Sequence, residues 1–536
     1  MERIPREIYH TLESIVGSEY ITEDPVICQA YSRGGYGKDI YDRGHVRPAC
    51  VILPGCTEEV QAIVKVCNRY KIPYIPVSTF YIGFCAPTKP YTIMVDLKRM
   101  DKLWINEKNM YAVVEPYVNY AQLNTEALKL GLYTNAPLCG AQASVLANHL
   151  FQGMGQNVWR TGFANKRILA VEWVLPDGEL LHLGSASIIK DYFWGEGPGP
   201  DLRGLVRGWF GHSGGLGIVT RIAVKLFPIP YKGVPEVWGV TPSTGFSLPS
   251  ERFRWYNVTC PTLEKAIKFM REVSKAEIAA VCMRIPYVWR YLRKATCREE
   301  LWGYWLEDKA KLKGQIPSIV RVAIWGFSSE KQVEYEEKVL MDIANEVGVT
   351  VKPASPYAAG ECLKPAASVR AFLPGGNFMG QKFNFDSLDH AVKVLKSGYK
   401  IKRKHIPPFM DDGEEAGWIL CFDFGYHVYA ELDYYFDAQE DVEEAIKAEE
   451  ELLKDDLEIK AYPGAQWGHL HEVSGPHMLN YHKLMEKIGK TFDPNHLSNP
   501  PRFIGTRKEE STILTEVWRK ICQSVIEEEK RRRKNS

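Results

Sequence analysis

The stretch that decides the fold is PLCGAQASVLANHLFQGMGQNVWRTGFANKRILAVEWVLPDGELLHLG, residues 137–184. It joins a loop of small residues, a polar glycine-rich segment, an apolar strand and an Asp177-Gly178 pair that is typical of a two-residue hairpin turn. A diphosphate is held by several backbone N–H groups that point inward with little side chain in the way. We therefore expect this stretch to line a phosphate-bearing cofactor.

The segments before this stretch predict an α/β unit. Three of them have the apolar character of short strands: residues 48–54, 72–78 and 91–97. A helix with apolar side chains at i, i+3, i+4 and i+7 follows the first strand, and we expect Thr57 to be its N-cap. Glu58 and Glu59 would then lie in the first turn, where the helix dipole favours negative charge. The order strand–helix–strand predicts parallel strand pairs.

From about residue 233 the pattern changes. Strand-like segments alternate with long charged helices, for example at residues 330–347 and 438–455. We interpret FDFGYHVYAELDYYFD, residues 422–437, as one strand whose alternation sends every second side chain to the same face. The pattern indicates an α+β region in which helices cover an antiparallel sheet.

The bulk composition excludes several classes of protein. A chain of 536 residues is too long for a single core, so we expect two or more domains. A net charge of +1 argues against a nucleic-acid partner. The 12 cysteines include no Cys-x-x-Cys, so we expect mostly free thiols and no cysteine-bound metal. Without a signal peptide or a long apolar run, we expect a cytoplasmic protein that is membrane-associated at most through a partner.

Two loops are suited to hold a diphosphate. Residues 76–88 offer the hydroxyls of Ser78 and Thr79 and a turn at Gly83, and residues 137–162 offer several glycines. Neither loop is a Rossmann or Walker sequence, and either could be an ordinary glycine-rich connection. Their spacing within one α/β region favours a joint role in binding one cofactor.

The order of these pieces resembles the flavoprotein family of vanillyl-alcohol oxidase and the flavin subunit of p-cresol methylhydroxylase. Residues 48–78 resemble the opening unit of that family, and residues 135–184 resemble its central flavin-binding stretch. Residues 197–230 resemble the end of the flavin domain, with the family's G-[IL]-[IV]-T turn at residues 217–220. FDPNHLSNPPRFI, residues 492–504, resembles the segment that returns to the flavin domain. Glycolate and D-lactate dehydrogenases are more distant members.

This resemblance implies FAD as the cofactor and a fold in two parts. The implied fold class is α+β: a two-subdomain PCMH-type FAD-binding domain in residues 1–232, and an α+β cap domain with an antiparallel sheet in residues 233–485. Residues 486–536 would return to the FAD-binding domain and end in a basic tail. FAD would lie extended between the subdomains, with its isoalloxazine ring at the cap.

The resemblance also assigns cofactor contacts by position. The implied contacts are Pro76, Ser78, Thr79, Gly83, Pro137, Gly140, Ser144, Gly155, Gly162, Ile218, Val219 and Arg502. The loop after Pro76 would hold the pyrophosphate, and Ile218 and Val219 would meet the adenine half. That loop, STFYIGFCAP, is more aromatic than the glycine- and arginine-rich sequence usual in the family.

The catalytic residues of the family transfer less directly. Its phenolate-binding Tyr/Arg cluster would fall near GAQWGHLHEVSGPH, residues 464–477, where no Tyr-Arg pair stands and His469 and His471 occur instead. A histidine suits proton abstraction from an alcohol or hydroxy acid, because its pKa lies near neutrality. The same histidines could equally cap a helix or hydrogen-bond in the core.

Three other side chains are candidates for the substrate site. Tyr426 or His427 could face the substrate or carry a covalent flavin link, or could simply pack in the core. Arg370 could bind a carboxylate through its bidentate fork. The hydroxy-acid branch of the family binds a metal with two histidines and a GDGN-type loop. This chain lacks the second histidine and that loop, so we expect no metal site.

The implied activity is a two-electron oxidation with hydride transfer to flavin N5. The substrate would be an alkylphenol or aromatic alcohol, or else a 2-hydroxy acid. A dehydrogenase that passes electrons to a protein or quinone is favoured over an oxidase, and we expect a homo-oligomer or a subunit of a complex. The alternative is a non-catalytic flavin subunit that relays electrons within a larger complex.

Overall fold

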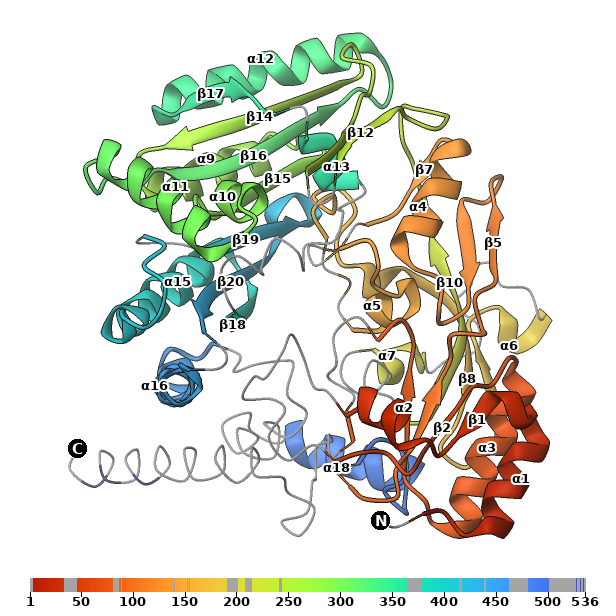
Figure 1. Ribbon diagram of the computed structural model, residues 1–536. Helices are drawn as coiled ribbons and strands as arrows, with labels where there is room; N and C mark the ends of the chain where they lie inside the picture. The colour runs from red at the N-terminus through yellow and green to blue at the C-terminus, as the bar shows by residue number, and fades with distance from the viewer. Residues whose placement is uncertain are drawn as a thin grey trace.

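The computed structural model shows an N-terminal part and a second part, built on a large sheet, that we call the cap (Figure 1). The residues that the structure describes are 3–32, 46–80, 86–87, 89–135, 137, 140–151, 153, 155–189, 201–207, 215–240, 243–355, 357–363, 377–413, 417–437, 440–461, 481–500, 527, 531 and 534. No described helix is long and apolar enough to cross a membrane.

The chain begins with a four-stranded sheet in the order β1-β2-β4-β3. Its strands are β1 (Ile21–Thr22), β2 (Cys50–Ile52), β4 (Ile93–Asp96) and β3 (Tyr74–Val77). The last three run parallel, as the strand–helix–strand order predicts. Helix α3 (Thr57–Tyr70) buries Val60, Ile63 and Val64 in one core with this sheet and with α1 (Arg6–Val16).

The start of α3 differs from the prediction by one residue. Cys56 is the N-cap, and Thr57 is the first helical residue. The Thr57 hydroxyl donates to Glu172 Oε1 at 2.7 Å, so it is engaged by a buried carboxylate on another sheet. Glu59 Oε2 accepts instead from the backbone N–H of Gly55 at 2.7 Å. A tertiary hydrogen bond thus replaces the expected local cap.

A second, antiparallel sheet follows in the order β5-β6-β10-β8-β9. Its strands are β5 (Leu103–Asn106), β6 (Tyr111–Val114), β10 (Ile218–Lys225), β8 (Ile168–Val174) and β9 (Leu180–Leu183). The predicted hairpin joins β8 to β9, and Gly178 has the positive φ (87°) that its turn requires. Helices α4 (Tyr120–Lys129) and α5 (Val145–Phe151) contribute to the core of this sheet.

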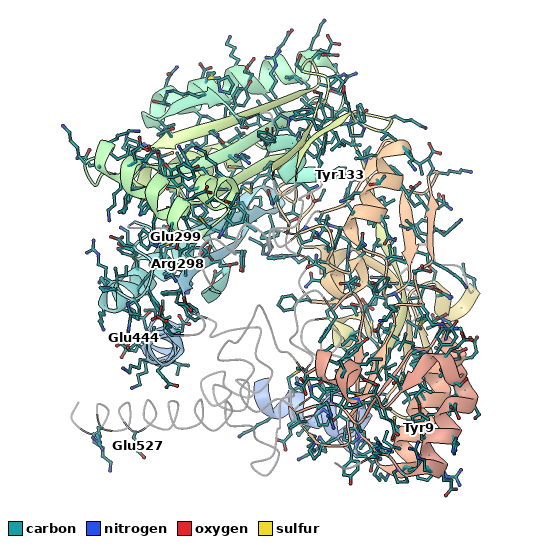
Figure 2. The ribbon with its side chains drawn as sticks, viewed as in Figure 1. Tyr9, Tyr133, Arg298, Glu299, Glu444 and Glu527 are labelled. Atoms are coloured by element: carbon teal, nitrogen blue, oxygen red, sulfur yellow. The ribbon has the colours of Figure 1, made fainter. Side chains whose placement is uncertain are left out.

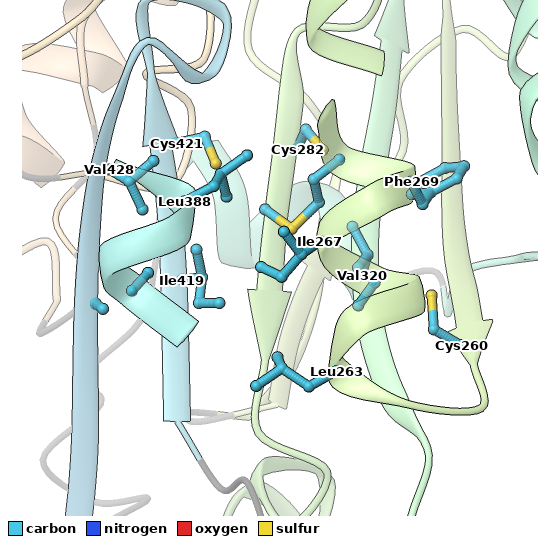
Figure 3. Packing of buried hydrophobic residues seen from close by; sticks show 14 of the residues in the cluster. Cys260, Leu263, Ile267, Phe269, Cys282, Val320, Leu388, Ile419, Cys421 and Val428 are labelled. Atoms are coloured by element: carbon cyan, nitrogen blue, oxygen red, sulfur yellow. The ribbon is translucent and has the colours of Figure 1, made fainter. Parts of the chain in front are cut away.

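The cap contains a seven-stranded antiparallel sheet, which confirms the predicted architecture. In spatial order the strands are β17 (Thr350–Pro353), β14 (Phe253–Cys260), β16 (Ser318–Trp325), β15 (Val281–Ile285), β19 (Gly417–Phe422), β20 (His427–Phe436) and β18 (Asn377–Asp386). One face packs against helices α9 (Leu263–Lys275), α12 (Glu330–Val347), α15 (Leu388–Lys402) and α16 (Val442–Ile459). Figure 3 shows Leu263 and Ile267 of α9 together with Val320 of β16 in this core. Part of the other face packs against the N-terminal part, and part against α10 (Trp289–Lys294) and α11 (Arg298–Lys311).

Residues 422–437 are not the single strand that we expected. The chain turns at residues 423–425 between β19 and β20, which pair as an antiparallel hairpin. Asp423, Phe424 and Gly425 have positive φ angles of 50°, 54° and 89°. Such angles end a strand, because β structure needs negative φ. The backbone N–H of Phe424 donates to Trp159 O at 2.6 Å, so the N-terminal part helps to hold this turn.

After the cap the chain returns to the N-terminal part. Phe492, at the end of α18 (Tyr481–Phe492), stacks on Trp173 of β8. Ser498 then forms a parallel bridge with Tyr74 of β3, and the Asn499 N–H donates to Tyr74 O at 2.8 Å. Figure 1 shows α18, in blue, close to the N-terminal elements. Residues remote in sequence thus complete the first sheet.

Candidate functional site

The first group of candidate residues lies beyond the carboxyl ends of parallel strands. Pro76 is in β3, and Ser78 and Thr79 follow that strand directly with partly exposed side chains. Ligands of open parallel sheets bind at such edges. Asp96 ends the neighbouring strand β4, and its carboxylate accepts a hydrogen bond from the Tyr31 hydroxyl. Ser78 and Thr79 therefore place two hydroxyl groups at an edge of the sheet that suits a diphosphate.

The second group is the glycine-rich segment that precedes β8. Gly153 and Gly162 both have φ of 69°, a conformation that glycine adopts without strain. A Cβ at Gly153 would collide with Ala164, and one at Gly162 would collide with the carboxylate of Asp423. Gly162 thus allows close approach between the N-terminal part and the turn that joins β19 to β20.

We expect Gly162→Ala to weaken this approach. The substitution adds strain from the positive φ and a collision with Asp423, and together these should lower the free energy of unfolding by about 1–3 kcal/mol. Gly314→Ala is the matched control, since Gly314 has a φ of 77° and open space around its Cβ position. Urea unfolding of both variants measures the difference. Equal losses would show that the contact with Asp423 contributes nothing.

The glycine-rich segment is anchored to the cap by its own side chains. Trp159 Nε1 donates to Ile278 O at 2.8 Å, and Arg160 Nε donates to Ala279 O at 2.7 Å. Arg160 Nη2 also pairs with the buried Glu336 at 3.1 Å. These bonds fix the segment at the junction of the two parts. A cofactor held by it would therefore meet the cap.

Four polar atoms in and around this segment are buried without a hydrogen-bond partner among the described residues: His149 Nε2, Thr161 Oγ1, Arg167 Nε and Arg167 Nη1. Buried polar groups are almost always paired, so these atoms point to a missing ligand. Burial lowers the pKa of His149 to about 3, which leaves its ring neutral. Neutral acceptors, hydroxyls and guanidinium donors suit the carbonyl and N–H groups of a flavin. The residues present therefore fit FAD.

The cap packs one face of its sheet against this segment. Phe163 stacks on Phe422 of β19 with ring centroids 3.9 Å apart. Tyr133 of the N-terminal part contacts Trp325 of β16 edge-on, and Figure 2 places Tyr133 where the two parts meet. Trp418 of β19 and Tyr429 of β20 belong to the same apolar cluster as Phe163. The junction is thus lined mainly by aromatic rings.

Two carboxyl groups lie buried on this same face of β20. Side chains alternate along a strand, so Glu431 and Asp433 share the face of Tyr429. The Tyr429 hydroxyl donates to Glu431, and Trp418 Nε1 donates to Asp433 Oδ2 at 2.9 Å. The two carboxyl groups lie close enough for the charge of Glu431 to act on Asp433, and Asp433 Oδ1 is buried without a hydrogen-bond partner among the described residues. We call this pair the carboxyl dyad.

Burial sets the protonation of the carboxyl dyad. It raises the pKa of both groups, and the adjacent negative charge of Glu431 raises the pKa of Asp433 further. The hydrogen bond from Tyr429 opposes the rise at Glu431. The pKa of Asp433 is thus raised further than that of Glu431, and Asp433 is the member that holds the proton. Glu431 retains 8% exposure, whereas Asp433 is almost wholly buried, so Glu431 is the more accessible base.

A buried ion pair stands next to the dyad. Lys402 Nζ lies 2.6 Å from both carboxylate oxygens of Asp412 and 2.7 Å from Asp433 O. Neither member of the pair exposes its side chain to solvent. This pair ties the end of α15 to β20 and keeps a positive charge close to the dyad.

Three of the remaining predicted cofactor contacts have side chains engaged within the protein, and three lie in loops. Ser144 Oγ donates to Pro116 O at 2.6 Å and accepts from the Ala147 N–H, so its hydroxyl is engaged within the protein. The side chains of Ile218 and Val219 are buried in the two cores of the N-terminal part. Pro137, Gly140 and Gly155 lie in the loops that flank α5.

The predicted catalytic residues are only partly placed. His427 lies at the junction, where Nδ1 is 3.3 Å from Asp423 Oδ2 and the ring meets Phe163 edge-on. Tyr426 is 72% exposed on the preceding turn. The other five predicted site residues lie outside the described residues: Gly83, Arg370, His469, His471 and Arg502. Among the described residues, no three His, Cys, Asp or Glu side chains group as a metal site would need.

The dyad, Arg167 and His149 were missed as site residues. Glu431 and Asp433 carried a usable signal, because two carboxylates two residues apart in an otherwise apolar strand must share its buried face. No comparable signal marks Arg167, which stands between the polar pair Asn165-Lys166 and the apolar strand that begins at Ile168.

Comparison with known proteins identifies the family of the N-terminal part. Residues 48–184 match the family described as FAD binding domain. A segment is 34% identical over 197 residues to a 1'-carboxy-chondrochloren decarboxylase from Chondromyces crocatus, and it covers 35% of each chain. The flavoprotein subunit of 4-cresol dehydrogenase (hydroxylating) from Pseudomonas putida is 29% identical over 34% of this chain and 36% of that protein. The matched stretch thus spans little more than a third of these relatives.

Other similarities extend over most of the chain. An alkyldihydroxyacetonephosphate synthase from Dictyostelium discoideum is 22% identical over 89% of this chain and 77% of that protein. The structure of p-cresol methylhydroxylase with substrate bound superposes with a TM-score of 0.74 and 17% identity, over 93% of this chain and 96% of that chain. Glycolate oxidase and D-lactate dehydrogenase sequences match at 26–29% identity. The predicted resemblance, fold class and FAD cofactor are confirmed.

Proposed function

We propose that this chain, whose residues 48–184 form an FAD-binding domain, is an FAD-dependent oxidoreductase that oxidises a small organic substrate at the junction with the cap. The match to the FAD-binding family carries the proposal. The polar atoms left without partners along the glycine-rich segment support it, because they lie where that domain meets the cap.

The carboxyl dyad would handle the substrate proton. FAD, when bound, supplies the two-electron acceptor at flavin N5. Glu431 would accept a proton from the substrate hydroxyl, and Tyr429 would hold the Glu431 carboxylate in place by donating to it. Histidines 469 and 471 were predicted for this role and remain candidates outside the described residues.

The lining of the junction favours an aromatic substrate. Phe163, Phe422, Trp418 and Tyr429 offer ring faces and edges, which bind other rings by stacking. An alkylphenol or aromatic alcohol therefore suits the junction better than a 2-hydroxy acid without a ring, which could not stack on these side chains. Electrons would then pass to a partner protein, since the 4-cresol dehydrogenase relative is named a flavoprotein subunit.

Anaerobic reduction of the purified protein tests this function. We expect a yellow protein whose visible flavin band bleaches with an alkylphenol or aromatic alcohol and returns slowly with oxygen but quickly with an artificial electron acceptor. Fast return with oxygen alone would indicate an oxidase, and bleaching by 2-hydroxy acids only would overturn the aromatic assignment. A yellow protein that no substrate bleaches would contradict the oxidoreductase proposal. It would favour a non-catalytic relay subunit, or a reaction without net oxidation.

A further inference from the structure

Arg167 is a buried cation without an adequate counter-group. It ends a short 3₁₀ turn, η2 (Ala164–Arg167), just before β8. Nη2 donates to Gly162 O, while Nε and Nη1 have no hydrogen-bond partner among the described residues. The guanidinium also lies 4.8 Å above the ring of Phe227. One carbonyl and one ring face leave most of its five N–H donors unsatisfied.

Arg167 nevertheless keeps its charge. Burial lowers its pKa only to about 10, so it is a cation at neutral pH. The negative charge of Asp423 raises the pKa of Arg167. Asp423, however, pairs with His427 at 3.3 Å and with Lys166 at 3.9 Å. A buried, protonated guanidinium with free donors requires an acceptor that carries or gains negative charge.

The position of Arg167 limits which end of the cofactor it can meet. Arg167 donates to Gly162 O, and Gly162 itself lies against Asp423 in the turn between β19 and β20. The hydroxyls suited to the pyrophosphate lie instead at the end of β3, on the other sheet of the N-terminal part. Arg167 therefore lies on the side of the cofactor that must face the substrate.

His149 supplies the complementary acceptor. Its Nδ1 lies 2.8 Å from Val145 O, which can only accept, and 2.9 Å from the Tyr120 hydroxyl. With the ring proton on Nδ1, directed at the Val145 carbonyl, the buried Nε2 is an unfilled acceptor. The charge of Arg167 contributes to the lowered pKa of His149, so the two side chains lie within electrostatic reach. The pyrimidine edge of a flavin offers an N–H donor between two carbonyl acceptors, which matches one acceptor beside a set of donors.

From this arrangement we infer that Arg167 and His149 bind the pyrimidine edge of the flavin, and that Arg167 stabilises the negative charge that this edge gains on two-electron reduction. The inference rests on FAD as the cofactor and not on the proposed substrate. Arg167 is then a residue that sets the reduction potential of the flavin.

The test is the reduction potential of the FAD-loaded protein. We expect Arg167→Gln to lower the equilibrium constant for two-electron reduction at least about tenfold, which is about 30 mV for a two-electron couple. Sulfite, which adds to flavin N5 and leaves negative charge on the pyrimidine edge, should bind at least about tenfold more weakly. Arg167→Lys keeps the charge and should retain most of both properties.

Arg203→Gln is the matched control, because Arg203 is equally buried in the same part of the chain but pairs with Asp201. An unchanged potential and sulfite affinity in FAD-loaded Arg167→Gln would overturn the inference. A raised KM for acidic substrates with an unchanged potential would overturn it too, by assigning the guanidinium to the substrate. If Arg167→Gln does not fold, two other FAD-loaded variants test the inference. An unchanged reduction potential in His149→Leu, together with an unchanged potential in Arg167→Lys at a pH high enough to deprotonate the lysine, would contradict the inference. The reduction potential and the sulfite affinity can be measured even if no substrate bleaches the flavin.

Discussion

Glu431→Gln is expected to slow reduction of the bound flavin by substrate at least about 100-fold, the usual contribution of a positioned general base. The amide cannot accept the substrate proton as a carboxylate does, whereas its size and its hydrogen bond with Tyr429 can be kept. Stopped-flow absorbance under anaerobic conditions measures the rate, and the flavin spectrum confirms that FAD remains bound.

Asp433→Asn is the matched control for this experiment. Asp433 is protonated, because burial and the neighbouring Glu431 hold its pKa well above the usual range. Asparagine is uncharged, like the protonated Asp433, and keeps an acceptor for Trp418 Nε1, so the rate should change less than about tenfold. A loss as large as that of Glu431→Gln would show that the proton on Asp433 itself is transferred.

The pH dependence follows from the same carboxylate. Burial raises the pKa of Glu431, and only its ionised form is a base. The rate of flavin reduction should therefore fall as the pH drops through that raised pKa, and this acidic limb should persist in Asp433→Asn. A rate that is independent of pH on the acidic side in the wild-type protein would argue against Glu431 and for another base, such as His469 or His471.

The sequence predicts the α/β unit, the hairpin at Asp177-Gly178 and the antiparallel cap because each depends on local periodicity and turn chemistry. It fails where distant residues decide the outcome. Thr57 does not cap α3, since Glu172 binds its hydroxyl, and residues 422–437 turn at Asp423, where Trp159 and Gly162 approach. Such long-range partners leave no local pattern.

The same limit applies to the candidate site. Glycines that need positive φ, such as Gly162, stand out in a sequence because few other residues serve there. Arg167 becomes notable only through its burial and its missing partners, which are properties of the folded chain. The sequence therefore indicates the FAD cofactor more directly than it indicates the side chains that would act on the flavin.

Lys402→Met is expected to have the largest effect on stability, a loss of about 3–5 kcal/mol at neutral pH. The substitution leaves the Asp412 carboxylate buried with no compensating cation at 2.6 Å, and it removes a donor to Asp433 O. The double variant Lys402→Met/Asp412→Leu removes both charges and should recover most of the loss. Urea unfolding of the FAD-loaded protein, followed by far-UV circular dichroism, measures each free energy.

The pH dependence of this loss distinguishes a charge effect from a packing defect. Burial raises the pKa of Asp412 to about 6, against about 3.9 in an unfolded chain, so its stabilising contribution is complete below about pH 4 and is lost as the pH rises through 6. Lys402 lowers that pKa, and without it the loss must extend above pH 6. The deficit of Lys402→Met should therefore shrink between pH 7 and pH 5. A deficit that is the same at both values would mean that lost packing around the lysine stem, and not the uncompensated carboxylate, destabilises the cap.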